Sequence, residues 1–341
     1  MNGVRHFLGK KCLTPRRGSL LIITLWMVAI LSVFAVAIAR YLSTEIRVTK
    51  YRLAREEAKT LARSGVYLAM ERLKQDAEEG VDWAEDDWSF VPSAPWVVSP
   101  TATEQEPSPE GDRVEISITD EERRLDLNAE TTTKEFIDAV AGVPGIGQPI
   151  VNYHDPAKQQ DEDQPEVSYY AKNGSIRSLD ELLDIPEVRQ KMQENPVALS
   201  ALFEQATVYT EGHVNVNTAS EQVLLAIKTP LIAQGFLTEG VIQAFVQRRG
   251  VGADGELGGP DDCLLTGDVN AIPQLEGACQ LVPEAIQNLI AGMDYQSSVF
   301  RIVAKGVVTR PSVEYRVEAI VKRSGCPDDA SSPCVVAWRE G

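Results

Sequence analysis

Two stretches of the chain carry enough acidic side chains to hold a calcium ion. Calcium is a hard cation that takes about six to eight oxygen ligands, mostly from carboxylates and carbonyls. Neither stretch has the spacing of an EF-hand loop, so the pattern favours a solvated acidic loop for each, with calcium as the alternative. No other cofactor is indicated, so calcium is the one candidate. The first stretch contains Asp155, Asp161, Glu162 and Asp163, and the second contains Asp254, Glu256, Asp261 and Asp262.

The cysteines fit disulfide bonds better than metal or redox chemistry. Cys12 lies in a basic N-terminal segment, which leaves four in the body of the chain. Four cysteines in an exported domain allow two disulfides and three pairings, and no CxxC motif indicates zinc or a redox centre. Proximity in the sequence favours one bond between Cys263 and Cys279 and one between Cys326 and Cys334, with four free thiols as the alternative.

Enzymatic residues are sparse. The chain has three histidines, His6, His154 and His213, and it contains no GxSxG, P-loop or HExxH motif. The adjacent His154 and Asp155 with a distant serine are too common a combination to indicate a triad. We therefore predict a protein without catalytic activity, with an exported, membrane-anchored hydrolase as the enzyme alternative.

The charge of the chain is unevenly distributed. Lys and Arg number 33 against 50 Asp and Glu, a net charge of −17, and 43% of the residues are apolar. This composition can form cores, and its acidic excess excludes nonspecific nucleic-acid binding, which needs a basic surface. Residues 1–18 carry no acid, and a basic start before an acidic body is typical of membrane-targeted chains. The basic residues of that segment are Arg5, Lys10, Lys11, Arg16 and Arg17.

Residues 19–39 form an uncharged apolar run that predicts a membrane-spanning helix. At 1.5 Å per residue these 21 residues extend about 31 Å, close to the hydrocarbon thickness of a bilayer. A buried core helix rarely stays apolar on all sides for this length, and a cleaved secretory signal has a shorter apolar region with a small-x-small site. Five basic residues precede the run and five follow it within about 16 residues, so the distribution of positive charge does not determine the orientation of the helix. We expect the large acidic body outside the cytoplasm, because large domains translocate regardless of local charge.

The helix is expected to continue after the membrane. Residues 40–75 lack proline, and small and apolar side chains recur at helical spacing. The proline-rich acidic segment 76–112 predicts a loop, and alternation over 113–119 predicts a strand. This stripe could pack on the chain's own domain or between subunits, and it consists of Ala54, Ala58, Leu61, Gly65, Leu68 and Leu73.

The second half of the chain divides into a helical block and a hairpin. Capping boxes starting at Thr132, Ser178 and Thr218 predict helices within residues 129–296. Alternating runs at 299–308 and 313–323 predict a β-hairpin, which needs a third strand or a helix to cover it. The strand at 113–119 and the long helix supply both, so the helical block is an insertion in the sheet's sequence. The helices are expected near 133–141, 179–184, 186–194, 196–205, 219–228, 238–249 and 283–291.

The start of the apolar run resembles the leader junction of pilins and pseudopilins, in which prepilin peptidase cuts after a glycine. The resemblance implies a leader over 1–18, cleavage between Gly18 and Ser19, and N-methylation of Ser19. Most pilins have a glutamate at the fifth mature position, where this chain has Ile23. A carboxylate in hydrocarbon needs a partner, so a subunit without it needs no neighbour ahead of it. The resemblance thus implies a tip subunit.

The order of the remaining motifs resembles the K-type minor pseudopilins of type II secretion, the general secretion pathway protein K family. The resemblance implies an α+β fold, in which a pilin-like N-terminal helix packs on a small antiparallel sheet with a large all-α domain inserted between strands. It also raises the expectation of bound calcium, without identifying its ligands. The motifs are ERRLDLN (122–128), IVNYHDP (150–156), YYAKNGSIRSLDELL (169–183), TVYTEGHVNVNTAS (207–220) and SSVFRIVAKG (297–306).

The resemblance also implies a domain plan and a role. The protein would cap and initiate the pseudopilus from the inner membrane, with one span, a cytoplasmic N-terminus and a periplasmic body. Its partners would be the other minor pseudopilins, the major pseudopilin, the inner-membrane assembly platform and prepilin peptidase, with no nucleic acid. The expected parts are the leader 1–18, the transmembrane helix 19–39, the extramembrane helix 40–75, the α/β domain 76–128 with 297–325, the insertion 129–296 and a tail 326–341.

Two alternatives share some of these features. A membrane-anchored minor type IV pilin would have the same leader and helix. A helix-hairpin-helix DNA receptor is the other, because HVNVNTASEQVLLAI (213–227) resembles the first half of such a unit. These units hold phosphate on the amides of a glycine-rich hairpin, and VPGIG (143–147) supplies such glycines elsewhere in the chain.

Overall fold

The computed structural model describes residues 19–76, 80–84, 86, 88–89, 96–98, 111–154, 172, 174–250, 252, 259, 261–326 and 332–341. Contacts divide the chain into two units, one ending at Ala54 and one running from Arg55 to Gly341. The leader and most of the predicted calcium residues lie outside the described residues. These are Gly18, Asp155, Asp161, Glu162, Asp163, Asp254 and Glu256.

One helix, α1 (Ser19–Asp76), begins the described chain and crosses the boundary between the two units. It contains no proline, and its single glycine is Gly65. In the first unit, the apolar side chains from Leu20 onward are exposed on all sides. The hydroxyls of Thr24 and Ser32 donate to carbonyls three and four residues back in the same helix, so these polar groups are satisfied within it.

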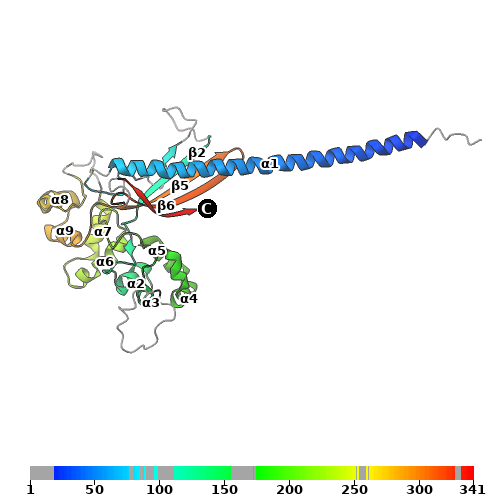
Figure 1. Ribbon diagram of the computed structural model, residues 1–341. Helices are drawn as coiled ribbons and strands as arrows, with labels where there is room; N and C mark the ends of the chain where they lie inside the picture. The colour runs from blue at the N-terminus through cyan, green and yellow to red at the C-terminus, as the bar shows by residue number, and fades with distance from the viewer. Residues whose placement is uncertain are drawn as a thin grey trace, which may run out of the picture. The chain divides into compact units, whose positions relative to one another are not determined.

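In the second unit, α1 packs on a five-stranded antiparallel sheet in the order β1-β2-β5-β6-β7 (Figure 1). The sheet contains the predicted hairpin and the predicted third strand, and burial alternates along β2 as the sequence indicated. The fold class expected from the sequence is confirmed. The strands are β1 (Trp96–Val98), β2 (Arg113–Asp120), β5 (Val299–Thr309), β6 (Ser312–Lys322) and β7 (Cys334–Glu340).

Two of these strands lie where none was expected. β1 pairs with β2 from within the predicted proline-rich loop, and β7 pairs with β6 from within the predicted tail. Neither segment shows a long alternation of apolar and polar residues. Each is an edge strand that pairs with one neighbour only. In addition, the side chain of Glu340 on β7 forms ion pairs with Lys59 and Arg63 of α1, at 3.0 and 2.7 Å.

The buried face of α1 agrees with the predicted stripe at four of its six positions, whereas Leu61 is half-buried and Leu68 is 38% exposed. Small residues are buried along this face, because the helix backbone approaches the strands closely. A Cβ at Gly65 would come 2.6 Å from Val114, and one at Gly306 on β5 would come 1.9 Å from the carbonyl oxygen of Ala58. The buried residues of this face are Ala58, Ala62, Gly65, Val66, Ala69 and Leu73.

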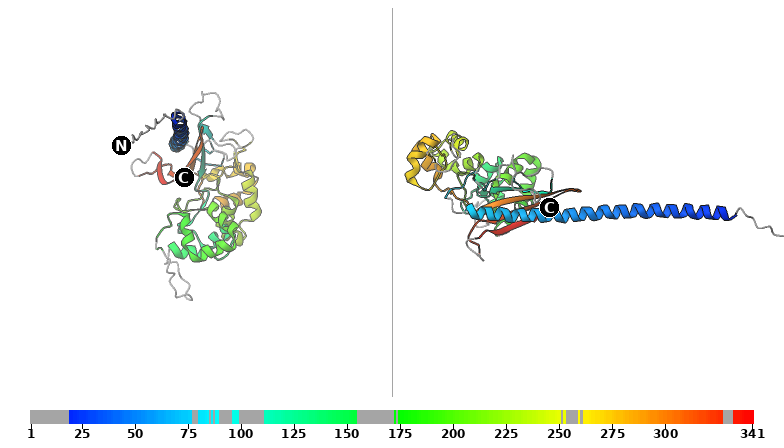
Figure 2. Two further views of the ribbon diagram at one scale, coloured as in Figure 1. Left: turned by 90° about the vertical axis from the view of Figure 1, so that its right-hand side faces the viewer. Right: turned by 90° about the horizontal axis from the view of Figure 1, so that it is seen from above.

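The helical block between β2 and β5 has its own hydrophobic core and lies on the face of the sheet opposite α1 (Figure 2). Leu125–Asp126 (β3) and Ala206–Thr207 (β4) form a short parallel pair within it. Two helices, α3 and α8, were not predicted. The helices are α2 (Lys134–Ala141), α3 (Gly147–His154), the 3-10 turn η2 (Leu179–Asp184), α4 (Pro186–Glu194), α5 (Pro196–Gln205), α6 (Glu221–Ala233), α7 (Glu239–Arg248), η3 (Val269–Ala271), α8 (Ile272–Cys279) and α9 (Pro283–Ile290).

Two of the three predicted N-caps are shifted. Ser178 caps η2 as expected, but Thr133 caps α2 and Ser220 caps α6, one and two residues after the predicted positions. The hydroxyl of Thr132 donates to the carbonyl of Asp126, and the hydroxyl of Thr218 donates to the carboxylate of Asp120. These hydroxyls are used in tertiary contacts, so a neighbouring hydroxyl takes over each cap.

The close approach of α1 to the sheet predicts a large effect of one added methyl group. Gly306→Ala should lower the free energy of unfolding of the second unit by about 3 kcal/mol, because the new Cβ meets backbone rather than a movable side chain. Gly277→Ala within α8 is the control: its Cβ meets nothing within 4 Å, and alanine should stabilise the helix by about 0.5–1 kcal/mol. Guanidinium unfolding of the detergent-solubilised chain would measure both. Equal stability of the two variants would contradict the close packing.

Candidate functional site: a spanning helix and a buried polar junction

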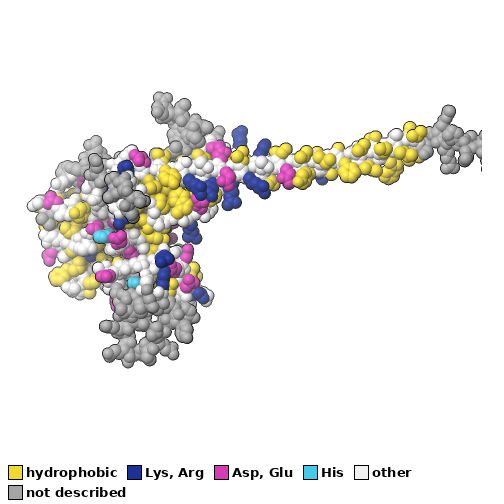
Figure 3. All heavy atoms as spheres, in the orientation of Figure 1, with side chains coloured by type: hydrophobic (Ala, Val, Ile, Leu, Met, Phe, Trp, Pro, Cys, Tyr) yellow, Lys and Arg dark blue, Asp and Glu magenta, His cyan; other side chains and the backbone are white. Residues whose placement is uncertain are grey.

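The N-terminal part of α1 has the length and apolar character of a membrane span. Among the helices of the described residues, α1 is the one that is long and apolar enough to cross a bilayer. Figure 3 shows hydrophobic side chains along this whole part of α1. Ser19 is the first residue of the helix, and Ile23, where a pilin would carry glutamate, is 53% exposed. The N-terminal part of α1 therefore presents an apolar surface without a charged side chain from Ser19 to Ala39.

Three consecutive acids, Asp120, Glu121 and Glu122, are buried where β2 leads into the helical block. Asp120 accepts hydrogen bonds from the hydroxyls of Thr218 and Ser297 and, at 2.8 Å, from the amide of Glu122. Burial raises the pKa of the Asp120 carboxyl to about 7, assisted by the neighbouring charge of Glu122. At neutral pH this carboxyl is therefore close to half protonated.

Glu121 has the opposite electrostatic environment. Burial alone would raise its pKa, but hydrogen bonds from Arg301 and the charge of Arg124 outweigh burial, so the pKa is lowered. Arg301 of β5 donates to both carboxylate oxygens, at 2.8 and 2.7 Å, and the hydroxyl of Thr207 donates at 2.7 Å. Arg301 also bonds Glu318 on β6. One buried ion pair thus joins β2, β5 and β6 to β4 of the helical block.

The two asparagines of the HVNVNT motif complete this junction. Asn215 donates to the carbonyl of Asp82 at 3.1 Å and to the hydroxyl of Ser297 at 2.8 Å. Asn217 exchanges two 2.9 Å hydrogen bonds with the backbone of Leu265, in the manner of a strand. Both side chains are fully buried. These two side chains connect segments that lie far apart in the sequence, which the local sequence pattern does not reveal.

A second buried cluster lies just after α1. The carboxylate oxygens of Asp76, Asp82 and Asp86 lie within 4.8 Å of one another, a spacing that would suit a metal ion. The guanidinium of Arg323 already supplies positive charge there: its Nη2 atom lies 2.5 Å from Asp82 and 3.2 Å from Asp76. The indole N–H of Trp88 donates to Asp82 and Asp86, at 3.0 and 2.9 Å. The cluster is therefore an internal ion-pair site.

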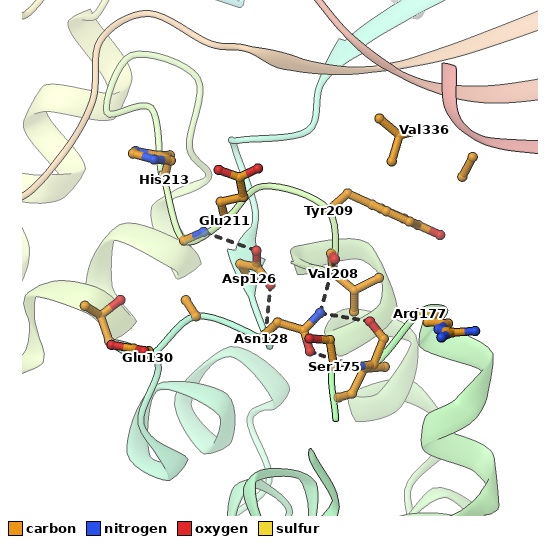
Figure 4. Close-up of a pocket in the computed structure, with 15 residues that line it drawn as sticks. Asp126, Asn128, Glu130, Ser175, Arg177, Val208, Tyr209, Glu211, His213 and Val336 are labelled. Atoms are coloured by element: carbon orange, nitrogen blue, oxygen red, sulfur yellow. Dashed lines mark hydrogen bonds between the residues drawn. The ribbon is translucent and has the colours of Figure 1, made fainter. Parts of the chain in front are cut away.

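An open pocket of about 980 Å³ lies between the helical block and β7 (Figure 4). Asn128 holds two of its walls together, since its side chain bonds the backbone of Ile176 twice, at 2.7 and 2.8 Å, and the carbonyl of Val208. His213 is paired with Asp294 at 2.6 Å, and this hydrogen bond raises the pKa of its imidazole. Figure 4 places Ser175 and His213 on opposite sides of the pocket. The histidine is thus part of an ion pair and is not placed beside this hydroxyl.

The glycine hairpin that suggested DNA binding is filled by the protein's own carboxylate. The hairpin joins α2 and α3, and the amides of Gly145, Ile146 and Gly147 point to Asp138 of α2 at 2.7 to 2.8 Å. These are the amides that would hold a phosphate in a helix-hairpin-helix unit. The side chain of Asp138 occupies them, so the hairpin is closed to a nucleic-acid backbone in this conformation.

The remaining predicted site residues lie around the disulfides. Cys263 is bonded to Cys279 of α8 at 2.08 Å, and Cys326 is bonded to Cys334 of β7 at 1.98 Å. Of the predicted calcium ligands, Asp261 and Asp262 are described. The carboxylate of Asp262 accepts the amides of Gly252 and Gly259, both at 2.9 Å, so it organises its own loop.

The comparisons with known proteins identify the fold. The chain is similar to a chain of the GspK-GspI-GspJ complex from the type 2 secretion system of enterotoxigenic Escherichia coli, with a TM-score of 0.52 and 16% identity. The alignment covers 86% of this chain and 99% of that one. No protein-family model matches, and no curated sequence matches. At this identity the likeness establishes the fold, and it confirms at that level the resemblance to pseudopilins inferred from the sequence.

The raised pKa of Asp120 predicts a pH-dependent stability. A carboxyl with a higher pKa in the folded chain stabilises the fold fully below its unfolded pKa, near 4, and this contribution is lost as the pH rises through about 7. Asp120→Asn should remove this loss, on the order of 3 kcal/mol between pH 4.5 and 7.5. Unfolding midpoints at the two pH values would measure it. Glu187→Gln, at an exposed carboxylate, should keep the wild-type profile, and an unchanged profile in Asp120→Asn would contradict the assignment.

Proposed function

We propose that the protein is a minor pseudopilin that caps and initiates a type II secretion pseudopilus, and thereby serves protein export across the outer membrane. The observation that carries the proposal is a pseudopilin-type fold attached to a spanning helix that has Ile23 in place of the usual acid. In a growing filament, a carboxylate buried in lipid needs the amino terminus of a neighbour. A subunit without that carboxylate can be placed first.

The inserted helical block also supports a position at the tip. The elements from β3 to α9 lie between consecutive strands of the pilin-like sheet. The junction of Glu121 with Arg301 ties this block to the sheet through buried charges, so it belongs to the same compact unit. A block of this size fits most easily where no subunit stacks ahead.

The partners follow from this role. We propose that α1 contacts other minor pseudopilins and the major pseudopilin, that the chain engages the inner-membrane platform, and that prepilin peptidase removes the leader. The similar protein is described as part of a complex with two other subunits. The body would lie in the periplasm and the N-terminus in the cytoplasm. The role is non-enzymatic, and calcium remains a prediction for the acidic loops around Asp155 and Asp254.

The alternatives are less well supported. A type IV minor pilin would share α1, but the similar solved chain comes from a secretion complex. A DNA receptor needs a hairpin open to phosphate, whereas Asp138 fills the one described here.

Leader processing can be tested directly. We expect mass spectrometry of the membrane-extracted protein to find a chain that begins at Ser19, heavier by one methyl group at its amino terminus. Gly18→Val should block the cut, because the peptidase recognises the residue before the bond, and the precursor should then accumulate. A mature chain that begins at Met1, or one that begins after residue 39, would contradict the proposal.

The tip position can be tested at residue 23. Ile23→Glu should reduce secretion by a factor of about ten or more while membrane levels of the protein stay near normal, because the acid would restore the pairing of an internal subunit. Ile22→Glu places an acid one residue earlier on another face and controls for the cost of insertion. Ile23→Leu should behave as wild type. Normal secretion by Ile23→Glu would count against the tip position.

A further inference from the structure

A row of basic side chains lies along one side of α1 directly after the apolar run. Arg40, Arg47 and Lys50, called here the basic stripe, are all exposed. At 100° per residue, Arg47 lies about 20° around the helix from Arg40, and Lys50 lies about 60° further in the same direction. The three side chains therefore share one face of the helix. Among the described residues, none of the three forms an ion pair with another side chain. The stripe is thus an unneutralised positive surface.

The other side of the helix is different. Glu45, the one acid between Arg40 and Lys50, lies about 140° from Arg40 around the helix, and Arg52 lies about 120° from it. Leu42 and Ile46 are exposed, at 53% and 56%, and Ile46 lies one helical turn before Lys50, at the edge of the stripe. Three of the four basic residues from Arg40 to Arg52 therefore lie within about 80° of one another, on the side of the helix opposite Glu45.

The apolar run fixes the height of the stripe relative to a membrane. Arg40 follows the last residue of the run, so it lies where hydrocarbon gives way to headgroups, a zone about 5–7 Å deep on each side. Arg47 lies about 10 Å further along the axis, and its long side chain can reach back about 6 Å. Spanning helices tilt by about 20° on average, and a tilt toward the stripe brings Lys50 within reach as well.

We propose that the basic stripe binds the phosphate headgroups of anionic phospholipids at the membrane surface where the span ends. The stripe is positive and lies at the depth of the headgroups, so anionic lipid is already beside it. An acidic protein would have to enter the headgroup layer to make the same contact. The contact holds α1 at one depth and one rotation, and so determines which face the subunit presents before assembly. The inference rests on the span, and it holds whether or not the protein is a pseudopilin.

The test uses the full chain in phosphatidylcholine vesicles that contain spin-labelled phosphatidylglycerol or spin-labelled phosphatidylcholine. We expect wild type to enrich the anionic label about fivefold or more over the neutral one, because each basic residue near a surface favours anionic lipid by about that factor. Arg40→Gln/Arg47→Gln/Lys50→Gln should abolish the enrichment. Arg52→Gln removes one charge from another face and should retain it. High salt should weaken the wild-type preference.

The possible results distinguish a failure of lipid binding by the stripe from a failure of the membrane span. Equal association of both labels with wild type would overturn the inference, as would full enrichment in the triple variant or an equal loss in Arg52→Gln. An acidic protein as the true partner would give the first of these results. Extraction of the chain from vesicles by alkaline carbonate would overturn the span itself, and with it both this inference and the inner-membrane role.

Discussion

Buried charge at the end of β2 is the constraint on which the rest of the structure depends. Asp120, Glu121 and Glu122 follow one another in the sequence and are all inaccessible to solvent. A buried carboxylate is costly unless other groups satisfy it, and removing one partner of a buried pair typically costs about 3–5 kcal/mol. The partners come from β4, β5 and the segments around Thr218 and Ser297. These bonds therefore tie the sheet and the helical block to each other.

The same constraint explains why the helical block stays with the sheet. Its apolar core is largely its own, so hydrophobic contact alone would leave it free to move relative to the strands. Directional bonds from Arg301, Asn215 and Ser297 remove that freedom. On the opposite face, α1 lies so close to β5 that only glycine fits at position 306.

Much of the architecture was predictable because its signals are local. The uncharged run 19–39, the alternation of β5 and β6, and Pro283 at the start of α9 each depend on neighbouring residues only. The missed elements have weak local signals. β7 is seven residues long and is held by β6, by the Cys326–Cys334 bond and by the contact of Glu340 with α1. α3 follows a glycine turn whose amides are satisfied by Asp138, a contact that spacing does not reveal.

The sequence by itself determined the apolar run, the basic segment before it, the missing acid at position 23 and the existence of a split sheet with helices between its strands. These depend on composition and period, which are readable along the chain. Only the tertiary structure decided that Thr218 serves Asp120 rather than a helix cap, that Leu68 of α1 stays exposed, and that Arg323 pairs with Asp76 and Asp82. The physical reason is that a buried polar group is satisfied by whatever donor the fold brings near, and that donor lies as many as 241 residues away.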